Sequence, residues 1–200
     1  MNRPAVEMID LVFDLRGEKL PVGYPFALWA ELVRLVPQLA DKENVGVLPL
    51  KGSENKDLIL LNKRAKLILR LPVSLTDEAA RLAGTQLEIL KNPLSVGDMK
   101  LRELQPYPTL HAQLAAGGED EAEFMESVLA HFSALEISAN TICGIRRTLS
   151  DDMQSISGFS LVVHDLKPDD SIRLQCAGMG TGRQFGCGIF VPYKVITDLE

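Results

Sequence analysis

Cysteine, tryptophan and long apolar runs are scarce in this sequence, and each scarcity excludes a class of protein. The 200 residues include three cysteines and one tryptophan. Cys143, Cys176 and Cys187 lie far apart and form no Cys-x-x-Cys pair, so they indicate buried apolar side chains instead of a disulfide framework or a cysteine zinc site. No run approaches the roughly 20 apolar residues of a membrane span. Acidic residues interrupt the apolar run near the N-terminus, so we expect a cytoplasmic protein with no signal peptide.

An excess of positive charge is also missing. The chain has 21 Lys and Arg against 27 Asp and Glu, which gives a net charge of −6. This balance argues against non-specific coating of nucleic acid but leaves room for a local basic groove. The hydrophobic content of 46% is ordinary for a globular protein, and a chain of this length can bury a core without disulfide bonds.

The spacing of apolar residues predicts two successive units with the same order of elements. The first half shows strands at 9–15, 45–50, 58–61, 66–71 and 86–90, with helices from 25 and from 74. The second half shows strands at 100–114, near 148, at 158–164 and at 189–193, with helices at 121–135 and from 168. We therefore predict an α+β fold of two tandem ferredoxin-like (βαββαβ) units, residues 1–95 and 96–200. That architecture serves many activities and does not by itself identify one.

A glycine-rich segment near the C-terminus is the strongest local signal. Five of the eleven residues from Gly178 to Gly188 are glycine. Such a loop can aim successive backbone amides at an anion, and Arg183 could add a phosphate-binding fork. The spacing is not that of a dinucleotide-binding loop or a P-loop. The alternative is a turn that only packs against its neighbours. The residues of this loop proposed to bind a phosphate chain are Gly178, Gly180, Gly182, Arg183, Gln184, Phe185 and Gly186.

Basic residues gather at two other places. The stretch from Leu58 to Thr76 contains no acidic residue, and its cations are Lys63, Arg64, Lys66 and Arg70. The last two fall on one face of a predicted strand, where they could bind phosphates or simply be solvated. Arg146 and Arg147 form the second basic point.

The three histidines differ in how well their positions suit a role in proton transfer. His111 lies on the first strand of the second half and is the best candidate for proton transfer. His131 falls off the apolar stripe of its helix and is expected at the surface. His164 precedes Asp165, but neighbouring strand residues point to opposite faces, so no His–Asp pair is expected there. No His, Cys and carboxylate cluster with metal-ligand spacing appears, so we expect no metal and no cofactor.

These motifs together resemble a known family. Gly178-x-Gly180 and Gly186-x-Gly188 with a basic residue between them resemble the glycine-rich loop of the RAMP superfamily. The chain is most similar to the CRISPR repeat endoribonucleases, the sixth family of CRISPR-associated proteins, in a subtype of short chains. The stretches that carry the resemblance are Val6–Gly17, Leu28–Pro37, Leu60–Pro72, Arg146–Leu149, Ser171–Leu174 and Arg183–Pro192.

The resemblance implies a function. Such proteins bind the repeat of a long CRISPR transcript and cut it without metal, by attack of the neighbouring 2′-OH on the phosphate. The expected partners are repeat RNA or the guide-RNA hairpin, and other subunits of a CRISPR effector complex. The family usually has a catalytic histidine at the start of the first helix, where this chain has Tyr24. Tyr24 and His111 are therefore the catalytic candidates, with packing as the alternative role for Tyr24.

A second departure from the family concerns charge after Arg147, where Asp151 and Asp152 replace an expected basic hairpin. Three hypotheses follow: a metal-independent endoribonuclease, a guide-RNA-binding subunit that does not cut, and a protein–protein module of the same fold.

Overall fold

The computed structural model describes residues 7–193, which form two compact units. The first unit comprises the chain up to Leu104 with two later segments, Leu149–Ser155 and Arg183–Gly186. The second unit comprises Gln105–Thr148, Ile156–Gly182 and the chain from Cys187 onward. The sequence-predicted boundary between residues 95 and 96 instead falls inside a strand of the first unit.

The first unit is built on a five-stranded antiparallel sheet with the strand order β3-β6-β1-β8-β7 and a smaller sheet with the order β2-β5-β4. The strands are β1 (Met8–Arg16), β2 (Lys19–Pro21), β3 (Gly46–Val47), β4 (Gly52–Asn55), β5 (Leu58–Leu61), β6 (Lys66–Pro72), β7 (Gln86–Ile89) and β8 (Asn92–Glu103). The helices are α1 (Tyr24–Leu35) and α2 (Thr76–Ala79), with 3-10 turns at Pro37–Asp41, Val73–Leu75 and Ala80–Leu82.

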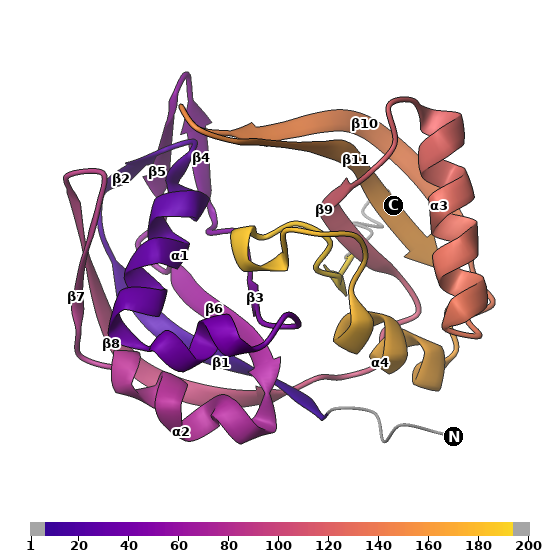
Figure 1. Cartoon of the computed structure of the whole chain (residues 1–200). Helices are drawn as coiled ribbons and strands as arrows, with labels where there is room; N and C mark the ends of the chain where they lie inside the picture. The colour runs from indigo at the N-terminus through magenta and orange to yellow at the C-terminus, as the bar shows by residue number, and fades with distance from the viewer. Residues whose placement is uncertain (1–6, 194–200) are drawn as a thin grey trace, which may run out of the picture. The chain divides into compact units, whose positions relative to one another are not determined.

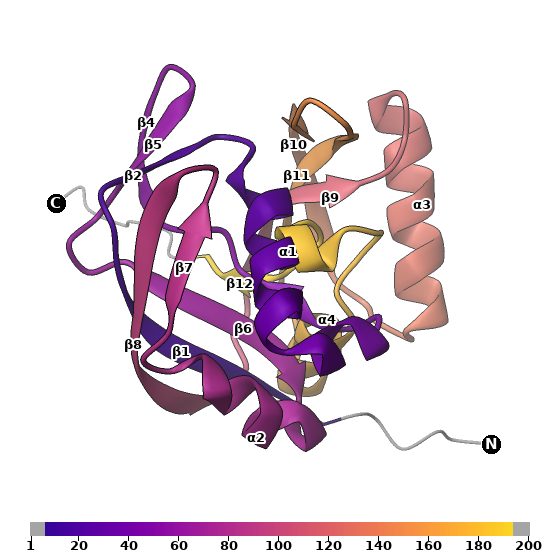
Figure 2. The ribbon, with the colours of Figure 1, turned by 60° about the vertical axis from the view of Figure 1, so that its left-hand side comes forward.

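One face of the large sheet holds the core of the first unit. Strand β1 alternates, so that Leu11, Phe13 and Leu15 lie on the face that packs against Leu28 and Leu32 of α1. All five side chains are at most 4% exposed. Figure 2 shows α1 and α2 on the same side of the sheet. The other face of β1 carries polar and charged residues, which is the period-2 pattern of a strand with one face buried.

The second unit contains a four-stranded sheet with the order β10-β11-β9-β12. Its elements are β9 (Leu110–Ala116), α3 (Glu121–Ala134), β10 (Asn140–Ser150), β11 (Ser155–His164), α4 (Pro168–Ala177) and β12 (Val191–Pro192). Phe124 and Val128 of α3 pack with Leu161 and Val163 of β11 in its core. None of the helices in residues 7–193 is long and apolar enough to cross a membrane.

Both units have the strand order of a ferredoxin-like fold. In the second unit, the first strand β9 lies between the third strand β11 and the fourth strand β12, with β10 at the edge. In the first unit, β1 lies between β6 and β8, with β3 beyond β6 in the same way. The tandem ferredoxin-like architecture predicted from the sequence is therefore confirmed, and β7 is an added edge strand.

Two predicted elements are corrected. The predicted strand 100–114 is wrong, because β8 ends at Glu103 in the first unit and β9 begins at Leu110 in the second. Pro106 and Pro108 lie in the connection between these two strands. The helix expected from residue 74 is a single α-helical turn, Thr76–Ala79, with a 3-10 turn on each side.

A buried ion pair joins the three central strands of the first unit. Asp10 on β1 is paired in register with Arg70 on β6 and Arg102 on β8. Its carboxylate accepts two hydrogen bonds from Arg70, at 2.8 and 3.1 Å, and one from Arg102 at 2.9 Å. The side chains of Asp10 and Arg70 are each 2% exposed. A buried guanidinium that loses its carboxylate leaves an uncompensated charge.

Asp10→Ala is therefore expected to lower the free energy of unfolding by about 3–5 kcal/mol. Equilibrium urea unfolding followed by circular dichroism measures this change. Asp14→Ala is the matched control, since the Asp14 side chain lies on the same strand face but is 54% exposed; its loss should cost little. Equal effects of the two substitutions would contradict the structural role of Asp10.

Candidate functional site

The glycine-rich segment begins and ends at one closed base in the second unit. The amide of Met179 donates to the carbonyl of Gly188 at 2.9 Å, and the amide of Gly188 donates to the carbonyl of Leu114 on β9 at 2.6 Å. A Cβ on Gly188 would lie 1.7 Å from the Met179 carbonyl oxygen. Glycine is required there because the two ends of the loop approach too closely for any side chain.

The loop exposes only its apex. Gly180 and Thr181 are exposed, whereas Gly178 and Gly186 are buried and Gly182 is half-buried. The amides of Gly178 and Gly186 donate to carbonyls of Leu174 and Arg183 within their own units. Fewer amides of the loop can therefore bind an anion than the sequence predicts, because several of them already donate to backbone carbonyls.

The middle of the loop, Arg183–Phe185, forms a 3-10 turn that belongs to the first unit. Phe185 packs against Phe26 of α1, with ring centroids 4.7 Å apart. Gly186 lies over Pro49, where an added Cβ would come within 3.1 Å of the proline ring. Arg183 is 6% exposed. The expectation of an exposed phosphate fork at Arg183 is thus corrected: this segment packs, and Phe185 stacks on another phenylalanine.

His131 is hydrogen-bonded to Gly178, the first residue of the glycine-rich loop. The sequence placed it at the surface, but it is half-buried, and its Nε2–H donates to the carbonyl of Gly178 at 2.7 Å. Gly178 caps the C-terminus of α4 with a φ of 64°. The histidine therefore links the last turn of α3 to the glycine that ends α4.

The basic residues between Leu58 and Thr76 differ in their exposure and in their ion pairs. Lys63 and Arg64 are exposed in the turn before β6, and Lys66 is exposed and ion-paired with Asp14. Arg70 is buried against Asp10. The predicted phosphate track along β6 is therefore wrong for Arg70, because a guanidinium at 2% exposure cannot reach a ligand in solvent. Alternation along the sequence correctly predicts that Lys66 and Arg70 share one face of β6. It cannot show that Asp10 on β1 is the register partner of Arg70.

Arg146 and Arg147 have separate environments on β10 in the second unit. Arg146 is exposed; its guanidinium donates to the carbonyl of Glu119 and lies 5.6 Å from the centre of the Phe159 ring. Arg147 is half-buried, and its buried Nε has no hydrogen-bond partner among the described residues. A buried guanidinium nitrogen without a partner is costly for stability.

His111 lies within electrostatic reach of Arg147 in this unit, two strands away in the sheet. It is half-buried on β9, where its register partners are Val162 on β11 and Val191 on β12. Its ring centroid is 5.4 Å from that of Tyr193. Burial lowers the pKa of His111, and the nearby Arg147 guanidinium lowers it further. The imidazole is therefore neutral at pH 7 and can accept a proton. Tyr193 is not among the site residues predicted from the sequence, because only the sheet order brings β12 beside β9.

Tyr24 has a structural partner. Its side chain is 4% exposed at the start of α1, and its hydroxyl accepts a hydrogen bond from the amide of Leu50 at 2.8 Å. Burial raises the pKa of Tyr24 to about 12. These contacts fit the packing role that was the stated alternative, and the catalytic role of Tyr24 stays a prediction. Tyr24 belongs to the first unit and His111 to the second.

The acidic tip of the β10–β11 hairpin adjoins the start of α1 within the first unit. A Cβ on Gly23 would lie 2.9 Å from the carbonyl oxygen of Ser150. The Asp151 carboxylate accepts hydrogen bonds from the amides of Met153 and Gln154, each at 2.8 Å. The carboxylate thus stabilises the turn of the tip itself.

His164 and Asp165 do form a pair, contrary to the expectation from strand alternation. Nδ1–H of His164 donates to the Asp165 carboxylate at 2.8 Å, and Asn140 donates to the same oxygen at 2.7 Å. These two hydrogen bonds, that of Asn140 foremost, lower the pKa of Asp165. β11 ends at His164 and Asp165 has a φ of 61°, so the rule of opposite faces does not apply beyond the strand.

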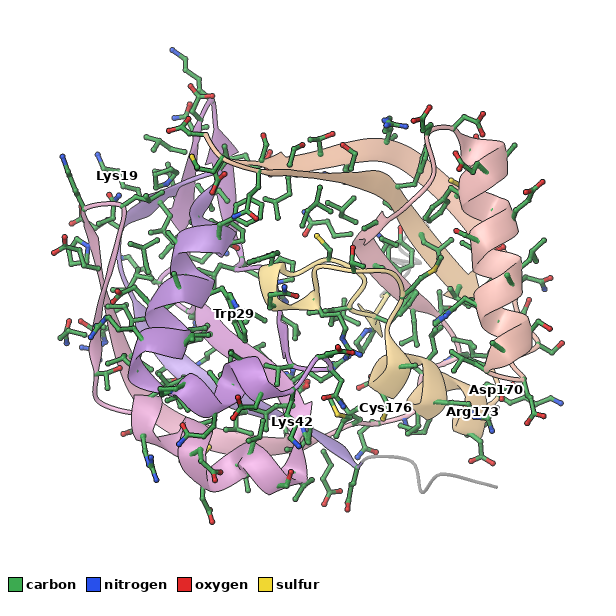
Figure 3. The ribbon with its side chains drawn as sticks, in the orientation of Figure 1. Lys19, Trp29, Lys42, Asp170, Arg173 and Cys176 are labelled. Atoms are coloured by element: carbon green, nitrogen blue, oxygen red, sulfur yellow. The ribbon has the colours of Figure 1, made fainter. Side chains whose placement is uncertain are left out.

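Neither a metal-binding cluster nor the pocket beside α4 involves the residues predicted to bind RNA or to catalyse, within the part of the chain that the structure describes. Residues 7–193 contain no group of three His, Cys, Asp or Glu side chains that could hold a metal ion. A shallow pocket of about 510 Å³ in the second unit is lined by residues that include Lys167, Asp170 and Arg173. Arg173 is ion-paired there with Asp170 at 3.3 Å, and Figure 3 labels both side chains. None of the residues predicted to bind RNA or to catalyse lines this pocket.

Tyr24→Phe tests the packing role. Removing the hydroxyl leaves the buried Leu50 amide without its acceptor, so we expect a loss of about 1–3 kcal/mol in unfolding free energy. The folded protein holds the pKa near 12 instead of 10.0. The stability that this shift contributes is present below pH 10 and is lost as the pH rises toward 12. Urea unfolding across this range should show a smaller alkaline loss in the variant; equal alkaline losses would contradict the burial of the phenol.

Comparison with known proteins identifies the family. The Cas6 Crispr family model matches residues 9–195. The chain is 33% identical over 186 residues to the CRISPR-associated endonuclease Cas6 of Myxococcus xanthus (strain DK1622), which covers 92% of this chain and 81% of that protein.

Solved structures share the fold at low sequence identity. A CRISPR-associated protein Cas6 superposes with a TM-score of 0.65 at 10% identity, over 94% of this chain and all of the other. A RAMP protein that binds different RNA substrates gives a TM-score of 0.63 at 12% identity, over 91% and 98%. Cse3 of Thermus thermophilus, bound to an RNA that represents a pre-cleavage complex, gives 0.54 at 10% identity, over 92% and 98%. With a family model that matches nearly the whole chain and a relative of this identity, the chain belongs to the Cas6 family of CRISPR-associated proteins.

Proposed function

We propose that this protein is an endoribonuclease that binds precursor CRISPR RNA and cuts it within the repeat. The observation that carries the proposal is the 33% identity to the Myxococcus xanthus endonuclease over 92% of this chain. The two ferredoxin-like units with a glycine-rich loop after α4 agree with it. The local groups that suit RNA are cationic side chains in an otherwise acidic chain of net charge −6.

The proposed chemistry uses the RNA's own nucleophile. The 2′-oxygen next to the scissile phosphate forms a bond to phosphorus while the bond from phosphorus to the 5′-oxygen breaks. The products are a 2′,3′-cyclic phosphate and a 5′-hydroxyl. The 2′-OH loses one proton and the leaving 5′-oxygen gains one, so atoms and charges balance without an oxidant or a metal ion. Catalysis then requires alignment, a proton acceptor and positive charge near the phosphate.

His111 and Arg147 are the residues proposed to meet those requirements. The lowered pKa of His111 makes it a neutral proton acceptor at pH 7, and the imidazolium that forms can return the proton to the leaving oxygen. Arg147 supplies positive charge within electrostatic reach of the same imidazole. Half-burial of both groups strengthens their interaction with a phosphate, because less water screens the charge.

A second candidate function is a guide-RNA-binding subunit that does not cut. Two observations favour it: Tyr24 is buried where a catalytic group was expected, and the acidic hairpin tip lies against Gly23 at the start of α1. Such a protein would bind the RNA with strong salt dependence and leave it intact.

The test separates the two functions. Purified protein is mixed with repeat RNA and excess EDTA, and the products are separated by gel and by mass. We expect cleavage that survives EDTA and leaves a cyclic phosphate. Tight binding without cleavage would support the non-catalytic subunit, and absence of both would contradict both proposals.

His111→Ala is expected to slow cleavage by about 100- to 10,000-fold at saturating RNA, the usual contribution of a general acid–base. In the parent, the rate should rise with pH through the lowered pKa of His111, below its ordinary value of 6.5, and level off above it. His164→Ala is the matched control, because His164 is in the same unit and pairs with Asp165 at the surface. Equal cleavage rates for parent and His111→Ala would remove His111 from the mechanism.

A further inference from the structure

The face of the first unit's sheet opposite the core carries a cluster of cations on three adjacent strands. The register places Asp10, Val12, Asp14 and Arg16 of β1 on this face, beside Lys66, Ile68 and Arg70 of β6 and Ser95, Lys100 and Arg102 of β8. Figure 2 shows these three strands side by side. Five of these positions are basic and two are acidic, and the β8 bulge opposite Asp14 adds a third carboxylate, that of Asp98. The face therefore bears net positive charge although the whole chain is at −6.

Two carboxylates organise the cations. Asp10 is ion-paired with both Arg70 and Arg102, so these three side chains together carry a net charge of +1. The Arg102 side chain is 51% exposed. Asp14 is hydrogen-bonded to Lys66 and is also within electrostatic reach of Lys100 and Arg16; these interactions, that with Lys66 foremost, lower the pKa of Asp14. Asp14 and the exposed Asp98 of the β8 bulge thus lie among three cations, and one positive charge remains over.

The exposed members can reach a ligand. Arg16 and Lys100 are exposed, and no ion pair holds either one among the described residues. They lie on neighbouring strands, but Lys100 is level with Val12, four residues or about 13 Å along β1 from Arg16, so together they span several phosphates of an extended chain. Glu88 on β7 lies one row beyond Arg16 in the register and lowers the charge at that end only.

We propose that this cationic face binds the ribose–phosphate backbone of single-stranded RNA that flanks the repeat. This inference rests on the proposed function, because it gives the long precursor a second place of contact. The face offers charge and guanidinium forks, which suit phosphates. The paired positions on it include no aromatic residue on which a base could stack, so the contact is independent of sequence.

An RNA backbone fits better than an acidic protein segment. A protein interface usually has an apolar core inside a polar rim, whereas here only Val12 and Ile68 lie among the charges, and both are half-buried already. A linear polyanion needs no apolar core, because counterion release supplies the affinity.

The experiment compares two double substitutions that remove the same charge. Arg16→Ala with Lys100→Ala alters the face. Arg81→Ala with Lys91→Ala is the matched control, because those side chains are exposed in the same unit but lie in the 3-10 turn after α2 and in the β7–β8 turn. The probes are repeat RNA alone and repeat RNA with an oligouridine tail. Affinity is measured over a range of salt concentrations, and cleavage is measured at saturating RNA.

We expect the face variant to lose affinity for the tailed RNA several-fold, with a salt slope smaller by about 2. Its affinity for the untailed repeat and its cleavage rate at saturation should match those of the control. Asp14→Asn should have the opposite effect and raise affinity for the tail, because it removes the carboxylate that offsets Lys66 and its neighbours. The opposite sign of this change separates a phosphate contact from a general loss of folding.

Three results would overturn the inference. If the parent cuts the repeat but the face and control variants bind the tailed RNA equally, the face inference fails and the proposed function stands. If the face variant binds the tailed RNA like the parent but loses affinity for polyglutamate, the face belongs to an acidic protein segment. If the parent binds neither RNA, the proposed function fails and the inference fails with it.

Discussion

The central strands of the first unit depend on one buried carboxylate. Asp10 accepts hydrogen bonds from Arg70 on one neighbouring strand and Arg102 on the other. A one-residue slip of either neighbouring strand would separate these groups and would also turn the apolar residues of the slipped strand outward. The charge pair and the apolar face therefore specify the same register. The same arrangement leaves an excess of cations on the face away from the core, so that a structural requirement also shapes the charge of the surface.

The second unit depends on close backbone approach instead. The glycine-rich loop is closed where Gly188 meets Met179, and its end is attached to β9 through Leu114. β9 also carries His111, and the neighbouring strand β12 follows the loop directly. The loop thus sets the position of β12 beside the proposed catalytic histidine, in addition to presenting its exposed apex at Gly180. The close approach of the backbone at Gly188 requires glycine there even without a bound nucleotide.

The sequence predicted the fold well and the site unevenly, and particular residues show why. Period-2 and helical patterns placed β1, α1, β6, α3 and α4, because burial of one face leaves a local signature. The same alternation put Lys66 and Arg70 on one face, but only the pairing of distant strands shows that Asp10 neutralises Arg70. Tyr24 could not be recognised as buried, since its partner Leu50 is 26 residues away. The sequence predicts one strand over 100–114, because nothing in this segment shows that β8 belongs to the first unit and β9 to the second.

In the proposed reaction the RNA's own 2′-hydroxyl attacks the scissile phosphate while His111 takes its proton. Replacing that single hydroxyl by hydrogen in the repeat RNA removes the nucleophile and changes no residue of the protein. We expect the 2′-deoxy RNA to bind with unchanged affinity and to yield no product. Cleavage of the 2′-deoxy RNA at the rate of the unmodified RNA would contradict it.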